Sequence, residues 1–443
     1  MTEFEHKQKV VDSVKAISKG PRSMQVYMDI CAKCGTCAEN CHVAYAFEGT
    51  QYNPAARSDL IRKMYKRETT LTGKLFRKGE LTDEDFDQWV RSFYECSGCR
   101  RCAVYCPYGI DNSVLTRKGR AIIHALDRSP TRMADTQKIS DEFGNDEAQP
   151  PKAIINALEF LEEEIEEETG VQVKIPVDQE ADILFVPASA DLISFPETQM
   201  GVAYFFHLAG LSWTMATDAV DGANFGLFTG DDAHMKRKNK LLHDACIKYN
   251  CKQLSIGECG HAYRIAKRIG GENSGKDENG NLPYTIDNIF PLAMRILREG
   301  KIKLDPTKFG KKVTYHDPCN FARSTGIVEE PREVLGALSD NFHEMYPNRE
   351  QNWCCGGGGG LAVMDGKEKV KWGEDEDFLS YRMQAGKKKV EQVAETGASY
   401  LAAPCANCKR HLQQLMEHHE TGVEVGGVFD LILKAAIPPE QDK

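Results

Sequence analysis

The sequence CAKCGTCAENC at residues 31–41 and the sequence CSGCRRCAVYCP at residues 96–107 decide the fold of the N-terminal part of the chain. Both runs have the spacing C-x2-C-x2-C-x3-C, and the second is followed by proline. Four thiolates on so short a stretch suit a [4Fe–4S] cube, and in two-cluster ferredoxins the fourth cysteine of each run binds the other cluster. Structural zinc is the alternative, but zinc motifs use paired C-x2-C spacings instead of a fourfold run. The two runs therefore predict two cubane [4Fe–4S] clusters.

Each predicted cluster takes ligands from both runs, because a short loop cannot wrap all four corners of a cube. We assign one cluster to Cys31, Cys34, Cys37 and Cys106, and the other to Cys96, Cys99, Cys102 and Cys41. Between the runs, residues 59–67 and 82–93 are expected to be helices, and Thr82 with Asp85 fits an N-cap and its N3 acid. We predict a helical double-cluster ferredoxin domain over residues 1–128.

The composition is that of an ordinary soluble chain. Its 443 residues, 41% apolar and 28% charged, suggest about two to four domains. A net charge of −10 argues against nucleic-acid binding. The N-terminus is charged and lacks the apolar core of a signal peptide, and no stretch approaches the ~18 apolar residues of a membrane helix. We expect a cytoplasmic protein, peripheral on the inner face of the cytoplasmic membrane through a partner, whose 16 cysteines are metal ligands or catalytic groups.

Charge is unevenly spread over the first 180 residues. Residues 57–120 hold 14 Lys+Arg against 9 Asp+Glu, whereas residues 141–180 hold 2 against 13. The basic stretch surrounds the cysteine runs, where its positive charge offsets that of metal–thiolate centres or binds an acidic partner. The alternative is that these basic residues form an ordinary solvent-exposed helix surface. Residues 129–180 are predicted to form a linker and an acidic helix, in which apolar residues between 154 and 165 recur at helical spacing.

The rest of the chain repeats itself. DILFVPAS at 182–189 matches VTYHDPC at 313–319, and QLSIGECGHAYR at 253–264 matches YLAAPCANCKRH at 400–411. The segments match in their spacing along the chain and in their predicted local structure, a strand followed by a turn and a helix. This match indicates an internal duplication of a strand–helix unit. We place the first half at residues 181–271 and the second at residues 286–443. The predicted fold class is α/β, or α+β overall: a helical ferredoxin domain followed by a duplicated α/β domain.

Five further cysteines belong to the second half: Cys319, Cys354, Cys355, Cys405 and Cys408. They supply one thiolate more than a cubane needs. The glycines at 356–360 allow close backbone approach and amides that face thiolate charge. This glycine run fails the G-x-G-x-x-G fingerprint and no phosphate loop occurs, so we expect neither flavin nor NAD. On these residues alone, a structural zinc site is the alternative.

The pattern C…CCG…C-x2-C, duplicated and joined to two ferredoxin runs, resembles the CCG-domain iron–sulfur subunits of heterodisulfide-reductase D type over roughly residues 25–435. Related proteins with this layout are DsrK, the corresponding Tmc and Hmc subunits, and the iron–sulfur subunit of glycolate oxidase. The resemblance implies that the five cysteines bind one noncubane-type [4Fe–4S] cluster that reduces or forms disulfides.

The first half departs from that pattern. The positions equivalent to the five cysteines are Ser189, Asn224, Phe225, Cys259 and Ala262. Only one thiolate remains, so we expect no second noncubane cluster. This degenerate first half is most similar to that of DsrK and of the Tmc and Hmc subunits.

The resemblance implies an oxidoreductase acting on sulfur, the catalytic subunit of a membrane-associated respiratory complex. Two cubane clusters would carry electrons to or from the noncubane site. The implied partners are a membrane haem b or quinone-interacting subunit, other subunits of the respiratory complex, and a DsrC-like sulfur-carrier protein with a disulfide or trisulfide. Two alternatives stay open: an electron-transfer subunit without its own substrate, of Tmc or Hmc type, and a glycolate-oxidase-type iron–sulfur subunit.

Three more residues are candidates for catalysis. Cys259 lies at a predicted strand-to-helix turn, where it either engages substrate sulfur or is a packed relic of the duplication. His261 follows Cys259, and His316 precedes Cys319. Each of the two histidines is either a proton donor or a structural residue whose ring nitrogens are hydrogen-bonded within the protein. Cys246 and Cys251 lack any partner spacing, so we predict buried thiols in a helix and the following turn.

Overall fold

The computed structural model describes residues 3–18, 22–75, 82–188, 190–269, 280–364, 367–372 and 375–438. The chain forms two compact units, each drawn from separate stretches of sequence. Unit 1 contains residues 1–135, 226–232 and 353–390. Unit 2 contains residues 136–225, 233–352 and 391–443. Within the described ranges, no helix is both long enough and apolar enough to cross a bilayer.

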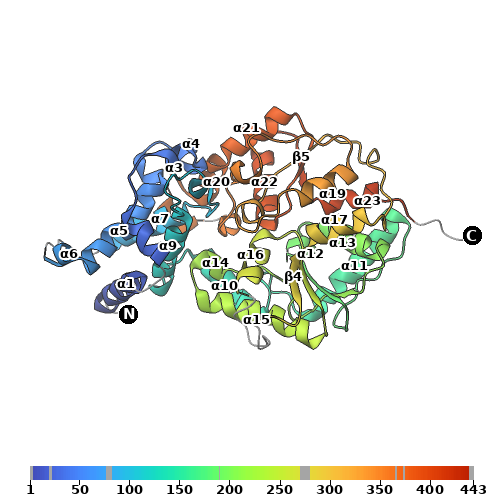
Figure 1. The fold of residues 1–443 in the computed structure, drawn as a ribbon, viewed down its shortest axis with the longest axis horizontal. Coiled ribbons are helices and arrows are strands. Elements are labelled where there is room, and N and C mark those ends of the chain that lie inside the picture. Colours follow the sequence, from blue (N-terminus) through green and yellow to red (C-terminus); the bar gives the residue numbers. More distant parts are fainter. Residues whose placement is uncertain are drawn as a thin grey trace, which may run out of the picture. The chain divides into compact units, whose positions relative to one another are not determined.

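Unit 1 is mostly helical. Its longer helices are α1 (Glu3–Ser18), α5 (Pro54–Thr69), α7 (Asp83–Tyr94) and α9 (Asn112–Ala125), which pack on one another (Figure 1). The predicted capping box opens α7: the Thr82 hydroxyl accepts from the Asp85 amide at 3.2 Å, and the Asp85 carboxylate accepts from the Thr82 amide at 2.8 Å. A Cβ at Gly119 would meet the Phe93 ring at 2.4 Å, so glycine lets α9 pack closely on α7.

Short elements complete unit 1. They are α2 (Arg22–Asp29), α3 (Thr36–Glu39), α4 (His42–Ala46), η1 (Thr50–Tyr52), α6 (Leu71–Leu75), α8 (Arg101–Val104), α14 (Gly226–Thr229), η4 (Leu361–Val363), β6 (Lys367–Trp372), β7 (Asp375–Asp377) and α20 (Phe378–Ala385). Helices α3 and α8, which lie inside the two cysteine runs, pack on each other. Helix α20 is anchored to the N-terminal part because the Tyr381 hydroxyl donates to the Glu95 carbonyl at 2.7 Å.

The first half of unit 2 is built on a parallel sheet of four strands in the order β2-β1-β3-β4. The strands are β1 (Ile183–Val186), β2 (Trp213–Thr214), β3 (Gln253–Ile256) and β4 (Thr285–Asn288). All four residues of β1 are buried, as expected for a central parallel strand covered on both faces. The helices of this half are α11 (Pro151–Thr169), α12 (Ala190–Ile193), α13 (Pro196–Leu208), α15 (Asp232–Lys248), α16 (Gly260–Ile269) and α17 (Ile289–Arg298).

The second half repeats this arrangement. Strands β5 (Val313–Tyr315), β8 (Tyr400–Ala402) and β9 (Glu424–Gly426) are parallel in the order β5-β8-β9, and a parallel bridge between Val313 and Phe342 takes the place of β2. Its helices are α18 (Cys319–Ala322), α19 (Glu330–Leu338), η3 (Arg349–Gln351), α21 (Lys387–Thr396), α22 (Ala406–His418), η5 (Phe429–Leu431) and α23 (Ile432–Ala435). The shared strand order confirms the predicted duplication and the α/β class.

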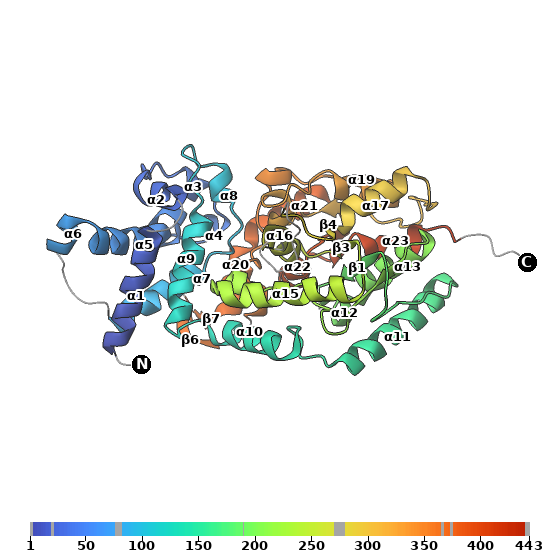
Figure 2. The same ribbon diagram turned by 60° about the horizontal axis from the view of Figure 1, so that its bottom comes forward.

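Residues 129–180 contain two helices. The polar part predicted as a linker forms α10 (Thr131–Phe143), and the predicted acidic helix is α11. Four apolar residues of α11 are buried at helical spacing: Ile154, Leu158, Leu161 and Ile165. This face packs against α13 and α23, which themselves contact each other (Figure 2).

Candidate metal centres

The first cysteine run and the end of the second line one hollow in unit 1. It measures about 350 Å³, and its cysteines are Cys31, Cys34, Cys37 and Cys106. Between two of them, Gly35 has a φ of 89°, a left-handed conformation that favours glycine. Cys34 is exposed, and hydrogen bonding to Thr36 lowers the pKa of its thiol. This hollow therefore brings one thiol to the protein surface.

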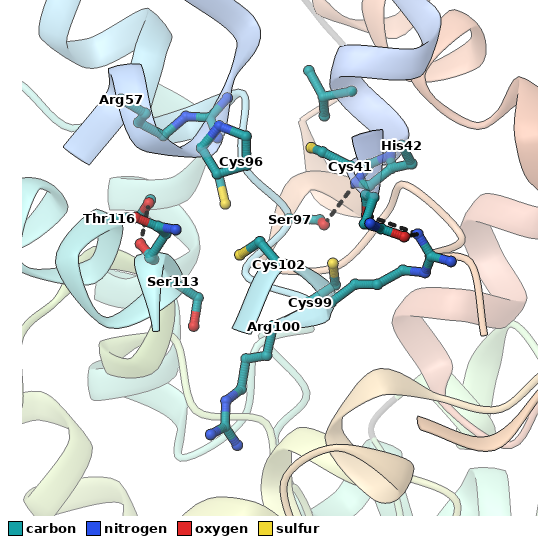
Figure 3. A pocket seen from close by; sticks show the side chains of 15 residues that line it. Cys41, His42, Arg57, Cys96, Ser97, Cys99, Arg100, Cys102, Ser113 and Thr116 are labelled. Carbon is teal, nitrogen blue, oxygen red and sulfur yellow. Dashed lines mark hydrogen bonds between the residues drawn. The ribbon is translucent and has the colours of Figure 1, made fainter. Parts of the chain in front are cut away.

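A second hollow in unit 1 measures about 380 Å³, and its cysteines are Cys41, Cys96, Cys99 and Cys102. Figure 3 shows their sulfur atoms around a common space, with Arg57 beside Cys96. Burial raises the pKa of Cys41 to about 11 and that of Cys102 well above its ordinary value. Without a metal these thiols are protonated, so metal binding here must displace their protons.

The donor sets fit iron–sulfur clusters. Each hollow offers four cysteines, and neither lining contains a carboxylate that would favour a hard cation. Arg57 of α5, only 2% exposed, lines the second hollow, and its buried Nη2 has no hydrogen-bond partner among the described residues. The Nε of Arg57 donates to the Ser92 carbonyl, but the buried positive charge beside four cysteines is best balanced by a negatively charged cluster.

Two more buried arginines brace the loops around the second hollow. Arg120 donates to the carbonyls of Cys96 and Gly359, both at 2.7 Å. Arg101 donates to the Asn40 carbonyl at 2.9 Å and stacks over the Trp353 ring at 3.6 Å from its centroid. The basic stretch at 57–120 was evident in the sequence, but its pattern could not show which arginines are buried against the cysteine loops.

Cys354 of the CCG sequence lies in unit 1 beside the second hollow. Its sulfur is 3.2 Å from the Ser97 hydroxyl, and that hydroxyl is 3.0 Å from Nε2 of His42. Nδ1 of His42 donates to the carbonyl of Ala385 at 3.0 Å. The sulfur atoms of Cys354 and Cys99 and a ring nitrogen of His42 all lie within 4.8 Å of one another. Sequence reasoning missed His42 and Ser97, although both directly follow cysteines of the runs.

The glycine run after Cys355 allows two kinds of close approach. A Cβ on Gly358 or Gly359 would lie 2.9 Å from the carbonyl oxygen of Ser97, so only glycine fits against that loop. Gly356, with a φ of 101°, points its amide at the Cys354 sulfur at 3.4 Å. The glycine segment therefore packs against the loop of the second cysteine run, and the amide dipole of Gly356 points at the sulfur of Cys354.

The other three cysteines of the C-terminal pattern lie in unit 2 and are buried. Cys319 starts α18, Cys405 is the N-cap of α22, and Cys408 lies in the first turn of α22. A ring nitrogen of His316 lies within 4.8 Å of the Cys408 sulfur. Because the five cysteines are divided between the two units, their common cluster stays a prediction from the sequence pattern.

Asp317 holds the turn that carries Cys319. Its carboxylate accepts two hydrogen bonds from Arg332, both at 2.8 Å, and one from the amide of Arg349 at 2.7 Å. The side chain of Asn352 donates to the Asp317 carbonyl at 2.6 Å. These contacts fix the Cys319 turn against the segment that precedes the CCG sequence, and they arise from tertiary packing that the sequence pattern did not reveal.

The degenerate first half keeps Cys259 at a site matching that of Cys405. The amide of Cys259 donates to Gly257 and that of Cys405 donates to Ala403, both at 2.7 Å. Cys259 is fully buried, and burial raises the pKa of its thiol well above the ordinary value. Among the other substituted positions, Asn224, Phe225 and Ala262 are buried, while Ser189 lies outside the described residues.

Next to Cys259, a charged group is buried inside unit 2. The ammonium of Lys409, 0% exposed, donates to Asp191 at 2.5 Å and to the Thr198 hydroxyl at 2.7 Å, and it lies 3.8 Å from Glu258. The Glu258 carboxylate also accepts from the amides of Val428 and Phe429, at 2.8 and 3.0 Å. The network links the turn after β3, which carries Glu258, to helix α22 and to the segment that follows β9.

Cys246 and Cys251 are buried thiols at the end of α15, as predicted. Asn250, with a φ of 52°, ends the helix, and the Cys251 amide donates back to the Cys246 carbonyl at 2.9 Å. This is the Schellman arrangement, in which the two flanking side chains pack together. Their burial is explained by this helix end.

Two family models match separate parts of the chain. Residues 27–110 match the 4Fe-4S dicluster domain, and residues 313–413 match the cysteine-rich domain named CCG. The chain carries an iron–sulfur dicluster domain and a CCG domain. The first match contains both N-terminal cysteine runs and the second all five C-terminal cysteines, so iron–sulfur clusters are implied in both regions.

Whole-chain relatives agree with these matches. The chain is 27% identical to the Hdr-like menaquinol oxidoreductase iron-sulfur subunit 2 of Archaeoglobus fulgidus, over 96% of this chain and 83% of that one. It is also 27% identical to the corresponding iron-sulfur subunit of Archaeoglobus profundus, over 97% and 83%. Identity to a subunit of the dihydromethanophenazine:CoB–CoM heterodisulfide reductase of Methanosarcina barkeri is 23%, over 92% and 94%. The chain is thus similar, along nearly its whole length, to iron–sulfur subunits of Hdr-like oxidoreductases.

Proposed function

We propose that this chain is the catalytic iron–sulfur subunit of a membrane-associated Hdr-like oxidoreductase that reduces or forms a disulfide or trisulfide. The cubane ligand sets are those that line the two hollows of unit 1. The third ligand set is Cys319, Cys354, Cys355, Cys405 and Cys408. Bound there, the two cubane clusters supply one-electron transfer and the noncubane cluster supplies two-electron sulfur chemistry.

One observation carries this proposal: the sulfur of Cys354 lies within 4.8 Å of the sulfur of Cys99. Cys99 belongs to the second hollow, whereas Cys354 opens the CCG pair. The amide of Gly356 and the hydroxyl of Ser97, 3.4 and 3.2 Å from the Cys354 sulfur, can stabilise negative charge on it. Unit 1 therefore brings the start of the CCG pattern to the edge of the second hollow, which we call the inner hollow, where the path for an electron is short.

The first hollow, lined by Cys31, Cys34, Cys37 and Cys106 and called the outer hollow from here on, is the proposed point at which electrons are exchanged with a partner. Cys34 is exposed, whereas the four cysteines of the inner hollow are only partly exposed, so an external electron carrier reaches the Cys34 side first. The similarity to menaquinol oxidoreductase subunits supports a membrane quinone-interacting or haem b subunit as that carrier. The isolated chain is then expected not to oxidise menaquinol until that subunit is added, and quinol oxidation by the chain alone would contradict this assignment.

The proposed substrate is the disulfide or trisulfide of a DsrC-like carrier protein, as the DsrK resemblance implies. Cys259 and His316 are the proposed substrate-side residues. His316 is buried near Cys408, and the Cys259 sulfur lies 3.4 Å from His261 Nδ1. His316 thus lies next to a ligand candidate of unit 2, and Cys259 lies next to a second imidazole.

A second candidate is an electron-transfer subunit without its own substrate. The names of the two Archaeoglobus relatives specify a quinol and no disulfide, which favours this alternative. The two functions differ in what oxidises the reduced protein. EPR spectra of anaerobically reduced protein during titration with a DsrC-like disulfide, and with the CoM–CoB heterodisulfide, separate them. Oxidation of the clusters by a disulfide supports the first function, and spectra unchanged by every disulfide support the second.

A further inference from the structure

Arg57 is a buried cation at the inner hollow of unit 1. It lies in the first turn of α5, is 2% exposed, and lines this hollow together with the four cysteines. Figure 3 shows it beside Cys96. Its Nε donates to the Ser92 carbonyl, whereas its buried Nη2 has no hydrogen-bond partner among the described residues. The guanidinium is therefore held at the hollow with one donor left over.

No carboxylate forms an ion pair with Arg57 in the part of the chain that the structure describes. Glu95, the C-cap residue of α7, is also buried, but it interacts with Arg57 only through the field of its charge, without a hydrogen bond between them. A buried charge without a direct partner is costly, and an arginine stays protonated in proteins. The group that the hollow binds must supply the counter-charge, as a cluster with four thiolate ligands does.

Two other arginines line the inner hollow, and both have partners. The Nε of Arg100 lies 2.8 Å from the Asp111 carboxylate, and Arg101 donates to the Asn40 carbonyl at 2.9 Å. At the outer hollow the lining cation is Lys33, whose side chain is 68% exposed and paired with a carboxylate at 2.9 Å. Hydrated and paired charges act weakly on a bound group, so Arg57 gives the inner hollow its distinct electrostatic character.

We propose that Arg57 raises the reduction potential of the cubane cluster bound in the inner hollow. The proposal rests on the proposed function, because it requires a cluster at the four cysteines of that hollow. It also gives that function a direction. A higher potential at the inner cluster draws electrons from the outer hollow towards Cys354, which favours reduction of a disulfide over its formation.

The expected effect follows from charge. Reduction adds an electron to the cluster and makes it more negative, and a nearby cation stabilises the reduced state more than the oxidised one. Because Arg57 is buried, water and salt screen its charge only weakly. The shift that it causes should therefore persist at high ionic strength, unlike that of an exposed cation such as Lys33.

The test is an EPR-monitored redox titration of the full chain and its variants under anaerobic conditions. Arg57→Gln removes the charge but keeps an N–H that can donate to the Ser92 carbonyl, and Arg57→Lys keeps the charge. Arg62→Gln is the matched control, because Arg62 is 5% exposed on the same helix but is paired with Asp59 at 3.1 Å and does not line the inner hollow.

We expect Arg57→Gln to shift the midpoint potential of the inner cluster to more negative values, at low and at high salt. The inner potentials of Arg57→Lys and Arg62→Gln should stay close to that of the wild type, with iron content unchanged in all three. An unshifted inner potential in Arg57→Gln would overturn the inference. An equal shift in Arg57→Lys would also overturn it, because lost packing and not lost charge would then be the cause.

Failure of the proposed function gives a different result. A wild-type protein without the inner cluster would contain about four irons fewer and lack its EPR signal, and both the proposed function and this inference would then be wrong. Iron content of the wild type therefore separates the two failures.

Pulsed EPR gives a second readout if Arg57→Gln does not fold. In protein whose arginines carry ¹⁵N only in the guanidinium group, the reduced inner cluster should show a weakly coupled nitrogen. This coupling should be missing in Arg57→Lys and present in Arg62→Lys. A coupling that persists in Arg57→Lys would show that Arg100 or Arg101 supplies it, and would overturn the proposal.

Discussion

Cys102 and Cys106 are four residues apart, yet they line different hollows of unit 1. The short helix α8 (Arg101–Val104) contains Cys102 and ends just before Cys106, so the chain passes from the inner hollow to the outer one at the end of this helix. Cys41 shows the reverse relationship, because it belongs to the first run and lines the inner hollow with Cys96 and Cys99. The fourth cysteine of each run is thus placed with the other run.

This exchange predicts the outcome of removing Cys106. In Cys106→Ser, we expect loss of the cluster bound by Cys31, Cys34 and Cys37, with about four irons fewer and the inner cluster retained. Cys41→Ser should do the opposite and damage the cluster of the second run. Iron analysis and the EPR signals of the two clusters distinguish the variants. Loss of the inner cluster in Cys106→Ser would show instead that all four cysteines of each run bind the same cluster.

The spacing of the two runs was enough to predict which four cysteines line each hollow, because the rule depends only on local loop geometry. The duplication was predictable for a similar reason, since matching strands and turns recur at equal spacing. The pairing of Cys354 with Ser97 and His42 was not, because it depends on packing between residues far apart in sequence. Nor could the pattern show that residues 353–390 pack into the same unit as the ferredoxin runs.

The second prediction concerns metal content. With two cubane clusters and one noncubane cluster, the anaerobically purified chain should contain about twelve irons. Mössbauer spectroscopy together with metal analysis measures both the number and the type of the clusters. About eight irons with one zinc would mean that the C-terminal cysteines form a structural zinc site.

The third prediction concerns the buried ion network of unit 2. Lys409→Met removes the cation that Asp191 and Glu258 share inside the protein, and leaves both carboxylates without it. Breaking a buried pair in this way costs about 3–5 kcal/mol in the free energy of unfolding. Chemical denaturation of the anaerobic protein measures the loss. The control is Lys311→Met, whose pair with Glu424 is at the surface, where the effect should stay below about 1 kcal/mol. Equal effects of the two changes would contradict this role of Lys409.

The fourth prediction concerns the dependence of stability on pH. Burial raises the pKa of Glu258 to about 8, against the opposing effects of Lys409 and of the backbone amide of Phe429. Between the unfolded value of 4.5 and this folded value, the folded state binds more protons than the unfolded state. Stability from this group is complete below pH 4.5 and is lost as the pH rises through 8. The unfolding free energy of Glu258→Gln should therefore rise relative to the wild type between pH 5 and about 8. Glu417→Gln is the control, because Glu417 is exposed. If the difference in unfolding free energy between Glu258→Gln and the wild type does not change with pH, Glu258 does not titrate in this way.

The last prediction concerns Cys259. Its position at the turn after β3 matches that of Cys405 after β8, so a thiol stands where an intact first half would bind its own cluster. Its sulfur lies 3.4 Å from His261 Nδ1, and after burial the charge of Cys405 is the main cause that raises the pKa of its thiol, as expected for a neighbour of the proposed third ligand set. Because burial raises its pKa, the resting side chain is a neutral thiol, and a bond to substrate sulfur requires that its proton leave during the step.

We expect Cys259→Ala to keep its full iron content and to lose turnover of a disulfide substrate. Cys246→Ala is the matched control, because Cys246 is also a buried thiol of unit 2 but lies at a helix end, where its carbonyl accepts from the amide of Cys251. That variant should retain both iron and turnover. The two proteins are compared by iron analysis and by the rate at which a DsrC-like disulfide reoxidises the reduced clusters. Wild-type turnover in Cys259→Ala would identify the thiol as a packed relic of the duplication, since its burial alone would then account for it.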